Sequence, residues 1–512
     1  MLNACSRLSA SRFLAVLLVL LALPLRSAEA YSVLSHEEVV DMAWLATIVP
    51  MLKARFPGIS DADLVMAHGY AYGGSVIQDI GYYPFGSPYY SDLLHYVRTG
   101  DFVSALIRES HDANEYAFAL GALAHYCGDV YGHPAVNIAT SDEFPKLKKR
   151  FGRSVTYDQD KVAHLRTEFG FDVVEVAHGR YSQQNYRDFI GFQVSKPLLE
   201  RAFQETYGIP MDSVMKHEDL AIATYRKAVS SLIPKMTTVA LVSYKDQIEK
   251  ENPGFNRNKF LYRLRRTEFE KEYGRQYVHP GPKTRFFAFF VAHLPKIGPL
   301  KALKLSIPNA DEQQIYIKSV NTTVDYYKIY LAQVTPPEPA VPWLPVYPSA
   351  PEKLLAPAHV ASKTVSDQPA VTPVPTPPIP ATLAVPAADP AMQMAEPASV
   401  QRAPDLAEID LDTGNPSRFG EYHLADETYA RLLNTILHDG KAQFTADVQQ
   451  SFKDFYSGPR NEPDWYRASS KDWTSLQADL VMLDALLPVP KAPTPAQTGV
   501  PAPSSVVPSV QP

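Results

Sequence analysis

The sequence predicts an all-α protein, and three observations support this fold class. Stretches such as "YAFALGALAHYCGDVYGH" and "DLAIATYRKAVSSLIPKMTTVALVSY" repeat apolar residues at three- and four-residue intervals, which is the period of an amphipathic helix. Alternating runs of β-branched residues, which would indicate strands, are few. The hydrophobic fraction of 46% and the charged fraction of 20% are ordinary for a globular protein, so the helices can bury a core.

The first thirty residues carry the three parts of a secretory signal peptide. Arg7 and Arg12 precede the apolar run "FLAVLLVLLALPL", and the small residues "AEA" follow it at the position of a cleavage site. We therefore expect residues 1–30 to be removed and the mature chain to begin at Tyr31, in the periplasm or outside the cell.

Composition divides the rest of the chain into five parts. Residues 31–250 keep a helical period, and residues 251–334 are predicted to be a helical extension of them. The proline-rich residues 335–404 have neither a helical nor a strand period, which predicts a disordered linker. Helical periodicity returns in residues 405–487, predicted to be a small helical module or a hairpin packed on the main domain. Residues 488–512 are expected to be a disordered tail.

The motif "HYCGDVYGHP" places His125, Asp129 and His133 four residues apart. On a helix, the side-chain direction changes by only about 40° over four residues, so all three side chains project from one face. Imidazole and carboxylate groups are zinc ligands. An exposed polar stripe would explain the same residues, but the apolar "FALGALA" upstream predicts a buried helix, in which ionisable groups need partners.

Further candidate ligands stand on both sides of this motif. His36, Asp79 and His95 precede it, and His164 and Glu168 follow it with the spacing of one helical turn. A histidine taken alone on an amphipathic helix is more often a surface residue or a satisfied core residue than a metal ligand. These residues can therefore form a metal site only if the fold brings their side chains together.

The ordered set of N-terminal residue, His, Asp, His, His-x3-Asp, His and His-x3-Glu resembles the zinc-dependent phospholipases C and the single-strand-specific nucleases that share their helical fold. The resemblance covers residues 31–244 and implies a multi-helix phospholipase C-like catalytic domain with three zinc ions. The implied ligands are Tyr31 (α-amino group and carbonyl), His36 and Asp129 for the first zinc, Asp79, His95, His125 and Asp129 for the second, and His133, His164 and Glu168 for the third.

One position departs from the pattern of the family, and the ligand pair for the third zinc leaves a choice between two candidates. Tyr31 replaces the usual Trp, but it would ligate through its backbone, and its α-amino group is free only after signal cleavage. His178 with Glu175 is an alternative pair for the third zinc, whereas the His-x3-Glu spacing favours His164 with Glu168.

The resemblance implies a secreted hydrolase that cleaves phospholipid headgroups and so takes part in lipid degradation. Zinc can activate water near neutral pH, and Asp79, as ligand or general base, would orient that water. Aromatic residues near Asp79 could line a cleft, bind a quaternary ammonium group or simply pack a loop; they are Tyr70, Tyr72, Tyr82, Tyr83, Phe85, Tyr89 and Tyr90.

Peripheral membrane contact is a second hypothesis drawn from the residues. The segment "KTRFFAFFVAHLPK", residues 283–296, flanks four phenylalanines with cations, as membrane-interface segments do. A buried helix with basic ends would have the same letters. A stable nucleic-acid partner is not expected, since the net charge is only -6. The sequence gives no evidence for an obligate oligomer.

Two competing functions stay open from the sequence. A secreted single-strand nuclease of the same fold is favoured by the five-residue gap from Tyr31 to His36 and disfavoured by the lack of a basic stripe in the metal region. A non-catalytic surface binding module stabilised by zinc is the other. Structural zinc has four protein ligands whereas catalytic zinc keeps a water position, so the three side chains assigned to the third zinc favour catalysis.

Overall fold

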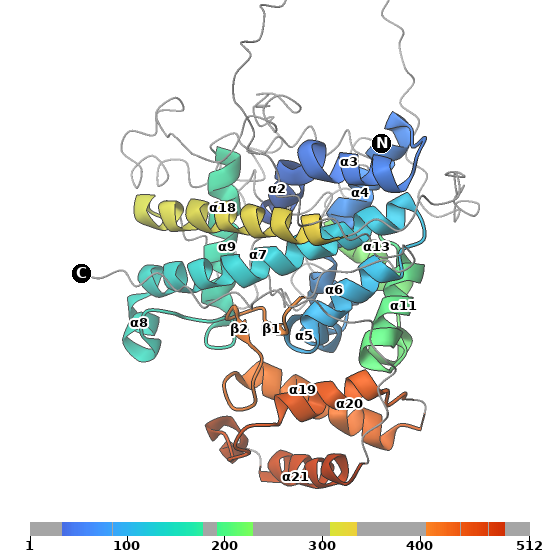
Figure 1. Ribbon diagram of the computed structural model, residues 1–512. Coiled ribbons are helices and arrows are strands. Elements are labelled where there is room, and N and C mark those ends of the chain that lie inside the picture. Colours follow the sequence, from blue (N-terminus) through green and yellow to red (C-terminus); the bar gives the residue numbers. More distant parts are fainter. Residues whose placement is uncertain are drawn as a thin grey trace, which may run out of the picture.

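The computed structural model describes residues 33–83, 85–177, 192–228, 308–334, 406–440, 442–468 and 470–486, and the structural statements below concern these residues. Their regular structure is almost entirely helical, which confirms the predicted all-α class (Figure 1). Tyr31, the predicted signal peptide and linker, and the aromatic segment 283–296 lie outside the described residues. None of the described helices combines the length and the apolar character that a membrane span needs.

The part of the structure before the predicted linker consists of helices alone. In chain order they are α2 (Val33–Ala43), the π-helical turn η1 (Trp44–Ile48), α3 (Val49–Arg55), α4 (Asp61–Gly74), the 3-10 helix η2 (Ile77–Tyr82), α5 (Pro88–Tyr96), α6 (Thr99–Arg108), α7 (Ala113–Glu143), α8 (Pro145–Phe151), α9 (Lys161–Ala177), α11 (Lys196–Tyr207), α12 (Met211–Val214), α13 (Glu218–Lys227) and α18 (Ala310–Gln333).

Helix α7 is the central helix, and α4, α6, α9 and α18 pack around it (Figure 1). It begins at the N-cap Asp112, whose carboxylate accepts hydrogen bonds from the N–H groups of Asn114 and Glu115. Its contact with α4 is backbone against backbone, because a Cβ atom at Gly121 would lie 2.0 Å from the carbonyl oxygen of Ala71. Glycine thus brings the end of α4 close to the metal-binding face of α7.

The part after the predicted linker begins with a short hairpin. Strands β1 (Ile409–Asp410) and β2 (Asn415–Pro416) pair antiparallel, a small departure from the all-helical expectation. Three helices and a 3-10 turn follow: α19 (His423–His438), α20 (Ala446–Phe455), η6 (Asp464–Ala468) and α21 (Ser470–Ala485). These elements form the lower, orange to red part of Figure 1, where α19 packs against α5.

Candidate metal centre

The fold brings eight of the nine predicted ligands into the interior of the helical part, and the ninth, Tyr31, lies outside the described residues. Their side chains are at most 2% exposed. They come from five elements: His36 from α2, Asp79 from η2, His95 from α5, His125, Asp129 and His133 from α7, and His164 and Glu168 from α9.

These eight residues form three groups in which the ligand atoms lie within 4.8 Å of one another. The groups are His36 with His125 and Asp129, Asp79 with His95 and His125, and His133 with His164 and Glu168. His125 belongs to two groups, so the first two lie side by side. The third group includes His133, which lies one turn beyond Asp129 on α7.

Asp129 lies between the first two groups. Its Oδ2 atom is 3.0 Å from Nε2 of His125 and 3.4 Å from Nε2 of His95. Its Oδ1 atom is 3.5 Å from Nε2 of His36, whose ring stacks on that of His125. One carboxylate therefore faces three imidazole nitrogens from different helices.

The other ring nitrogens show why a cation suits this site. Nδ1 of His95 donates to the carbonyl of Ser91 at 2.8 Å, and Nδ1 of His125 donates to the carbonyl of Ser75 at 2.9 Å. In the neutral imidazoles the Nε2 atoms then carry lone pairs that face carboxylate oxygens, an arrangement that needs a proton or a metal ion in between. No hydrogen bond of good geometry joins either Nε2 atom to another described residue.

The charges of these groups are strongly coupled. The carboxylates of Asp129 and Asp79 raise the pKa of His95 well above its ordinary value, although burial lowers it. Burial also raises the pKa of Asp129, but the neighbouring histidines, His125 foremost, bring it well below its usual range. Burial raises the pKa of Asp79, and this effect outweighs the opposite effect of His125 and His95. A buried set of carboxylates and imidazoles that attract positive charge in this way fits divalent metal ions.

The third group is arranged differently. His164 Nε2 lies 2.7 Å from Glu168 Oε1, and His133 Nε2 lies 3.8 Å from the same oxygen. Burial lowers the pKa of His133 to about 4 and that of His164 to about 3, so both rings are neutral at pH 7, the form that binds metal. Of the alternative pair, His178 lies outside the described residues and the side chain of Glu175 is not described.

The aromatic residues near Asp79 pack mainly into the core. Five of the seven are buried, namely Tyr72, Tyr82, Tyr83, Tyr89 and Tyr90. The ring of Tyr82 lies 5.8 Å from that of His95, so it is part of the wall of the metal centre. Phe85 is 56% exposed and has a φ of 66°. The aromatic set is thus mostly internal packing around η2.

Sequence reasoning missed a contribution from the segment after the linker. The carbonyl of Leu411 accepts a hydrogen bond from Nδ1 of His133. Oδ1 of Asp412 lies 3.8 Å from Nε2 of the same histidine. The only local signal was the pair of aspartates in "EIDLDTGNP" directly after the prolines. Nothing in that pattern indicates which helix it meets.

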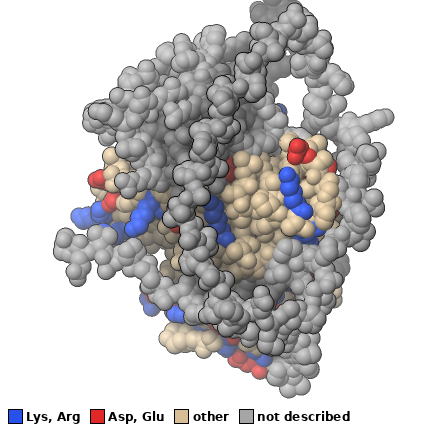
Figure 2. Space-filling model, turned by 45° about the horizontal axis from the view of Figure 1, so that its top comes forward, with Lys and Arg blue, Asp and Glu red and all other residues tan. Residues whose placement is uncertain are grey.

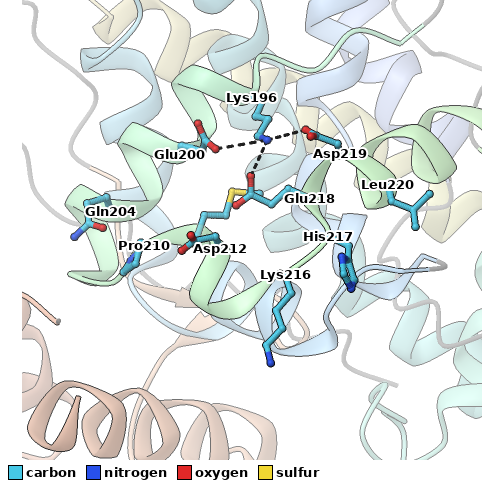
Figure 3. Close-up of a pocket in the computed structure, with 11 residues that line it drawn as sticks. Lys196, Glu200, Gln204, Pro210, Asp212, Lys216, His217, Glu218, Asp219 and Leu220 are labelled. Atoms are coloured by element: carbon cyan, nitrogen blue, oxygen red, sulfur yellow. Dashed lines mark hydrogen bonds and ion pairs between the residues drawn. The ribbon is translucent and has the colours of Figure 1, made fainter. Parts of the chain in front are cut away.

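The pocket drawn in Figure 3 is separate from these groups. It has a volume of about 650 Å³ and is lined from α11 to α13, without any of the eight clustered residues. Lys196 points into a set of carboxylates there, at 2.6 Å from Asp219, 3.2 Å from Glu218 and 3.8 Å from Glu200. Lys196 is thus already paired, and none of the eight clustered metal-ligand candidates lines this pocket.

The helical fold encloses three groups of histidine and carboxylate side chains, each of which could hold a metal ion. Residues 38–216 match the sequence model of the family "Zinc dependent phospholipase C", which confirms the resemblance seen in the sequence. This region, which holds seven of the eight clustered residues, is a domain of that family, a family of hydrolases. Comparisons with curated proteins and with solved structures gave no match.

Proposed function

We propose that the protein is a secreted zinc-dependent phosphodiester hydrolase that cleaves phospholipid headgroups. The family match of residues 38–216 supports the class of reaction. The observation that carries the proposal is the position of Asp129, whose carboxylate faces three imidazole nitrogens inside the protein. A carboxylate so placed can bridge two metal ions, an arrangement that serves phosphodiester hydrolysis.

The donor set fits three zinc ions, one at each group, and the α-amino group and carbonyl of Tyr31 would complete the first. Bound zinc supplies a water that ionises near neutral pH and positive charge for the phosphate oxygens. The chain supplies the orientation: the carbonyls of Ser75 and Ser91 fix the tautomers of His125 and His95, so that both Nε2 atoms point at the carboxylates.

Asp79 is the residue that we assign to the attacking water, as a ligand or as the base that takes up its proton. The helix η2 that carries it is fixed on α5, because Ser91 Oγ donates to the carbonyl of Gln78 at 2.5 Å and accepts from the N–H of Gly81 at 2.9 Å. Gln78 in turn donates to the carbonyl of Ala122 on α7 at 3.0 Å.

The choice of a phospholipid over a nucleic acid rests on the family and on charge. A nuclease that tracks a phosphate backbone needs a continuous basic surface. Among the described residues on the face drawn in Figure 2, Lys and Arg stand in separate groups. The gap from Tyr31 to His36 favours the nuclease, so the test includes both substrates.

The test measures zinc content by mass spectrometry and hydrolysis of phosphatidylcholine vesicles and of single-stranded DNA by the exported protein. We expect about three zinc ions per chain, in line with three ligand groups, and release of phosphorylated headgroup. Asp129→Ala should lower the hydrolysis rate by about 100-fold or more and remove at least one zinc, because it takes away a shared ligand. His111→Ala is the matched control, since the His111 side chain is 69% exposed.

Full activity in Asp129→Ala would contradict the assignment of the site. Hydrolysis of DNA but not of vesicles would replace the phospholipase with the nuclease. Tightly held zinc without either activity would favour a binding module.

Export is part of the proposal, because the first zinc needs the free α-amino group of Tyr31. An α-amino group has an ordinary pKa of about 7.7 to 8.0, so zinc can displace its proton near neutral pH. A variant in which cleavage after Ala30 is blocked should therefore bind one zinc fewer than the mature protein. Equal zinc content in the two forms would remove the N-terminal ligand.

A further inference from the structure

The segment of residues 406–417, which we call the post-linker segment, is built into the metal centre. It lies beyond residues 38–216, the range of the family match. The N–H of Leu411 donates to the carbonyl of the predicted ligand His95 at 3.0 Å. Asn137, two turns beyond Asp129 on α7, donates its side-chain amide to the carbonyl of Asp412 at 2.8 Å. The segment therefore spans two of the ligand-bearing helices.

This segment holds Nδ1 of His133 through a hydrogen bond and places a carboxylate oxygen near Nε2. Nδ1 donates to the carbonyl of Leu411, which leaves the lone pair of Nε2 for a metal ion. Oδ1 of Asp412 lies 3.8 Å from Nε2, the same separation as Oε1 of Glu168. Two ligand atoms at about 2.0–2.2 Å from one zinc can be at most about 4.4 Å apart, so both carboxylates satisfy this limit relative to His133.

Asp412 is held so that one of its oxygens faces His133. Its Oδ2 atom accepts hydrogen bonds from the hydroxyl groups of Tyr96 at 2.8 Å and Tyr422 at 2.6 Å. The side chain is only 1% exposed. A buried carboxylate that has two donors on one oxygen and faces an imidazole with the other has the geometry of a supported metal ligand.

Charge balance points to the same role. With neutral His133 and His164, Glu168 alone leaves one positive charge of a zinc ion uncompensated in a buried site. A second carboxylate makes the site neutral, and an uncompensated buried charge is costly. Among the described residues, Asp412 forms its ion pair with a histidine and not with a lysine or arginine.

We propose that Asp412 is a carboxylate of the third metal site, so that the post-linker segment completes the centre and the bound ion ties the C-terminal helices to α7 and α9. The inference rests on the proposed function in that it assumes an ion at the third group. Asp412 would be a fourth protein donor at the third group, beside His133, His164 and Glu168. Asp412 lies outside the set of three whose ligand atoms are within 4.8 Å of one another, so the proposal requires its side chain to move inward when an ion binds.

The experiment compares zinc retention in the full mature protein and its variants. Each is equilibrated with a graded series of a zinc chelator, and zinc per chain is counted by mass spectrometry. Asp412→Asn keeps the shape of the side chain but loses its charge, and we expect one zinc ion to dissociate at roughly 10- to 100-fold lower chelator concentration than in the unchanged protein. Asp412→Glu should restore part of the retention.

Two further variants separate ligation from folding. Asp426→Asn alters an equally buried carboxylate of the C-terminal helices, one that accepts from the N–H of Gly420, and should keep three zinc ions. Tyr422→Phe removes one donor to Asp412 without changing any ligand, and should weaken retention of the same ion less than Asp412→Asn does. Hydrogen exchange in residues 406–417 should rise on chelation in the unchanged protein.

The outcomes are distinguishable. Zinc retention in Asp412→Asn equal to that of the unchanged protein would overturn the role of Asp412. Three retained ions with higher activity would also overturn it, and would show instead that the segment blocks the site. A protein without zinc at any group would be a failure of the proposed function.

Discussion

At the scale of single residues, the metal centre depends on how each histidine uses its two ring nitrogens. Three of them, His95, His125 and His133, give Nδ1 to a backbone carbonyl, and the three acceptors come from α5, the end of α4 and the post-linker segment. The histidines are therefore oriented by backbone, which a side-chain substitution elsewhere does not remove. Nε2 stays available to the ion.

Ser91 offers a test of this support without touching a ligand. Its hydroxyl joins Gln78 and Gly81 of η2, so Ser91→Ala leaves a buried carbonyl and a buried N–H without their partner. We expect a loss of about 1–3 kcal/mol in the free energy of unfolding, and weaker zinc binding at the group of Asp79. Denaturant unfolding and chelator titration measure the two effects.

Ser213→Ala is the control for Ser91→Ala. Its hydroxyl also donates to a backbone carbonyl, that of Pro210 at 2.6 Å, but at the surface. A loss of stability without any change in zinc binding would show that Ser91 supports the fold and not the site.

At the scale of elements, helical periodicity was the basis for predicting the helices and the ligands that share a helical face. The four-residue spacing on α7 places its three ligands on one face whatever the rest of the chain does, and the same holds for His164 and Glu168 on α9. The hairpin β1–β2 could not be predicted, because two-residue strands leave no period. The position of Asp412 could not be predicted either, since its partner on α7 is set by tertiary packing.

Helix α19 supplies a prediction about pH. Burial raises the pKa of Asp426 to about 7, whereas an unfolded aspartate titrates near about 3.9. Between these values the folded chain holds a proton that the unfolded chain has lost, so the free energy of unfolding falls as the pH rises through this range. Asp426→Asn cannot ionise and can still accept from the N–H of Gly420.

The stability of Asp426→Asn relative to the unchanged protein should therefore increase by on the order of 2 kcal/mol from pH 4.5 to pH 8. Denaturant unfolding with excess zinc at both pH values measures it. Glu427→Gln, on the exposed side of α19, should show no such trend. A constant difference between Asp426→Asn and the unchanged protein would show that Asp426 is already ionised in the folded chain.

At the scale of the whole molecule, the helices before and after the predicted linker share one interior. Gly414, with a φ of 69°, lies so close to α7 that a Cβ atom there would be 2.6 Å from the carbonyl oxygen of Val130. Tyr126 of α7 donates to the carbonyl of Ala407 at 2.7 Å. These contacts pack the post-linker segment against α7, whereas the sequence left open a separate small module or a hairpin packed on the main domain.

The hydrogen bond from His133 to Leu411 also sets an order of events during synthesis. The two residues are 278 positions apart in the chain. The helices up to α9 emerge first, and their histidines stay without this acceptor until nearly the whole chain has been made. Closing so long a loop costs only slightly more entropy than closing a shorter one, so stability does not suffer, but the contact forms late. We expect the third ion to be held tightly only after the post-linker segment has packed against α7.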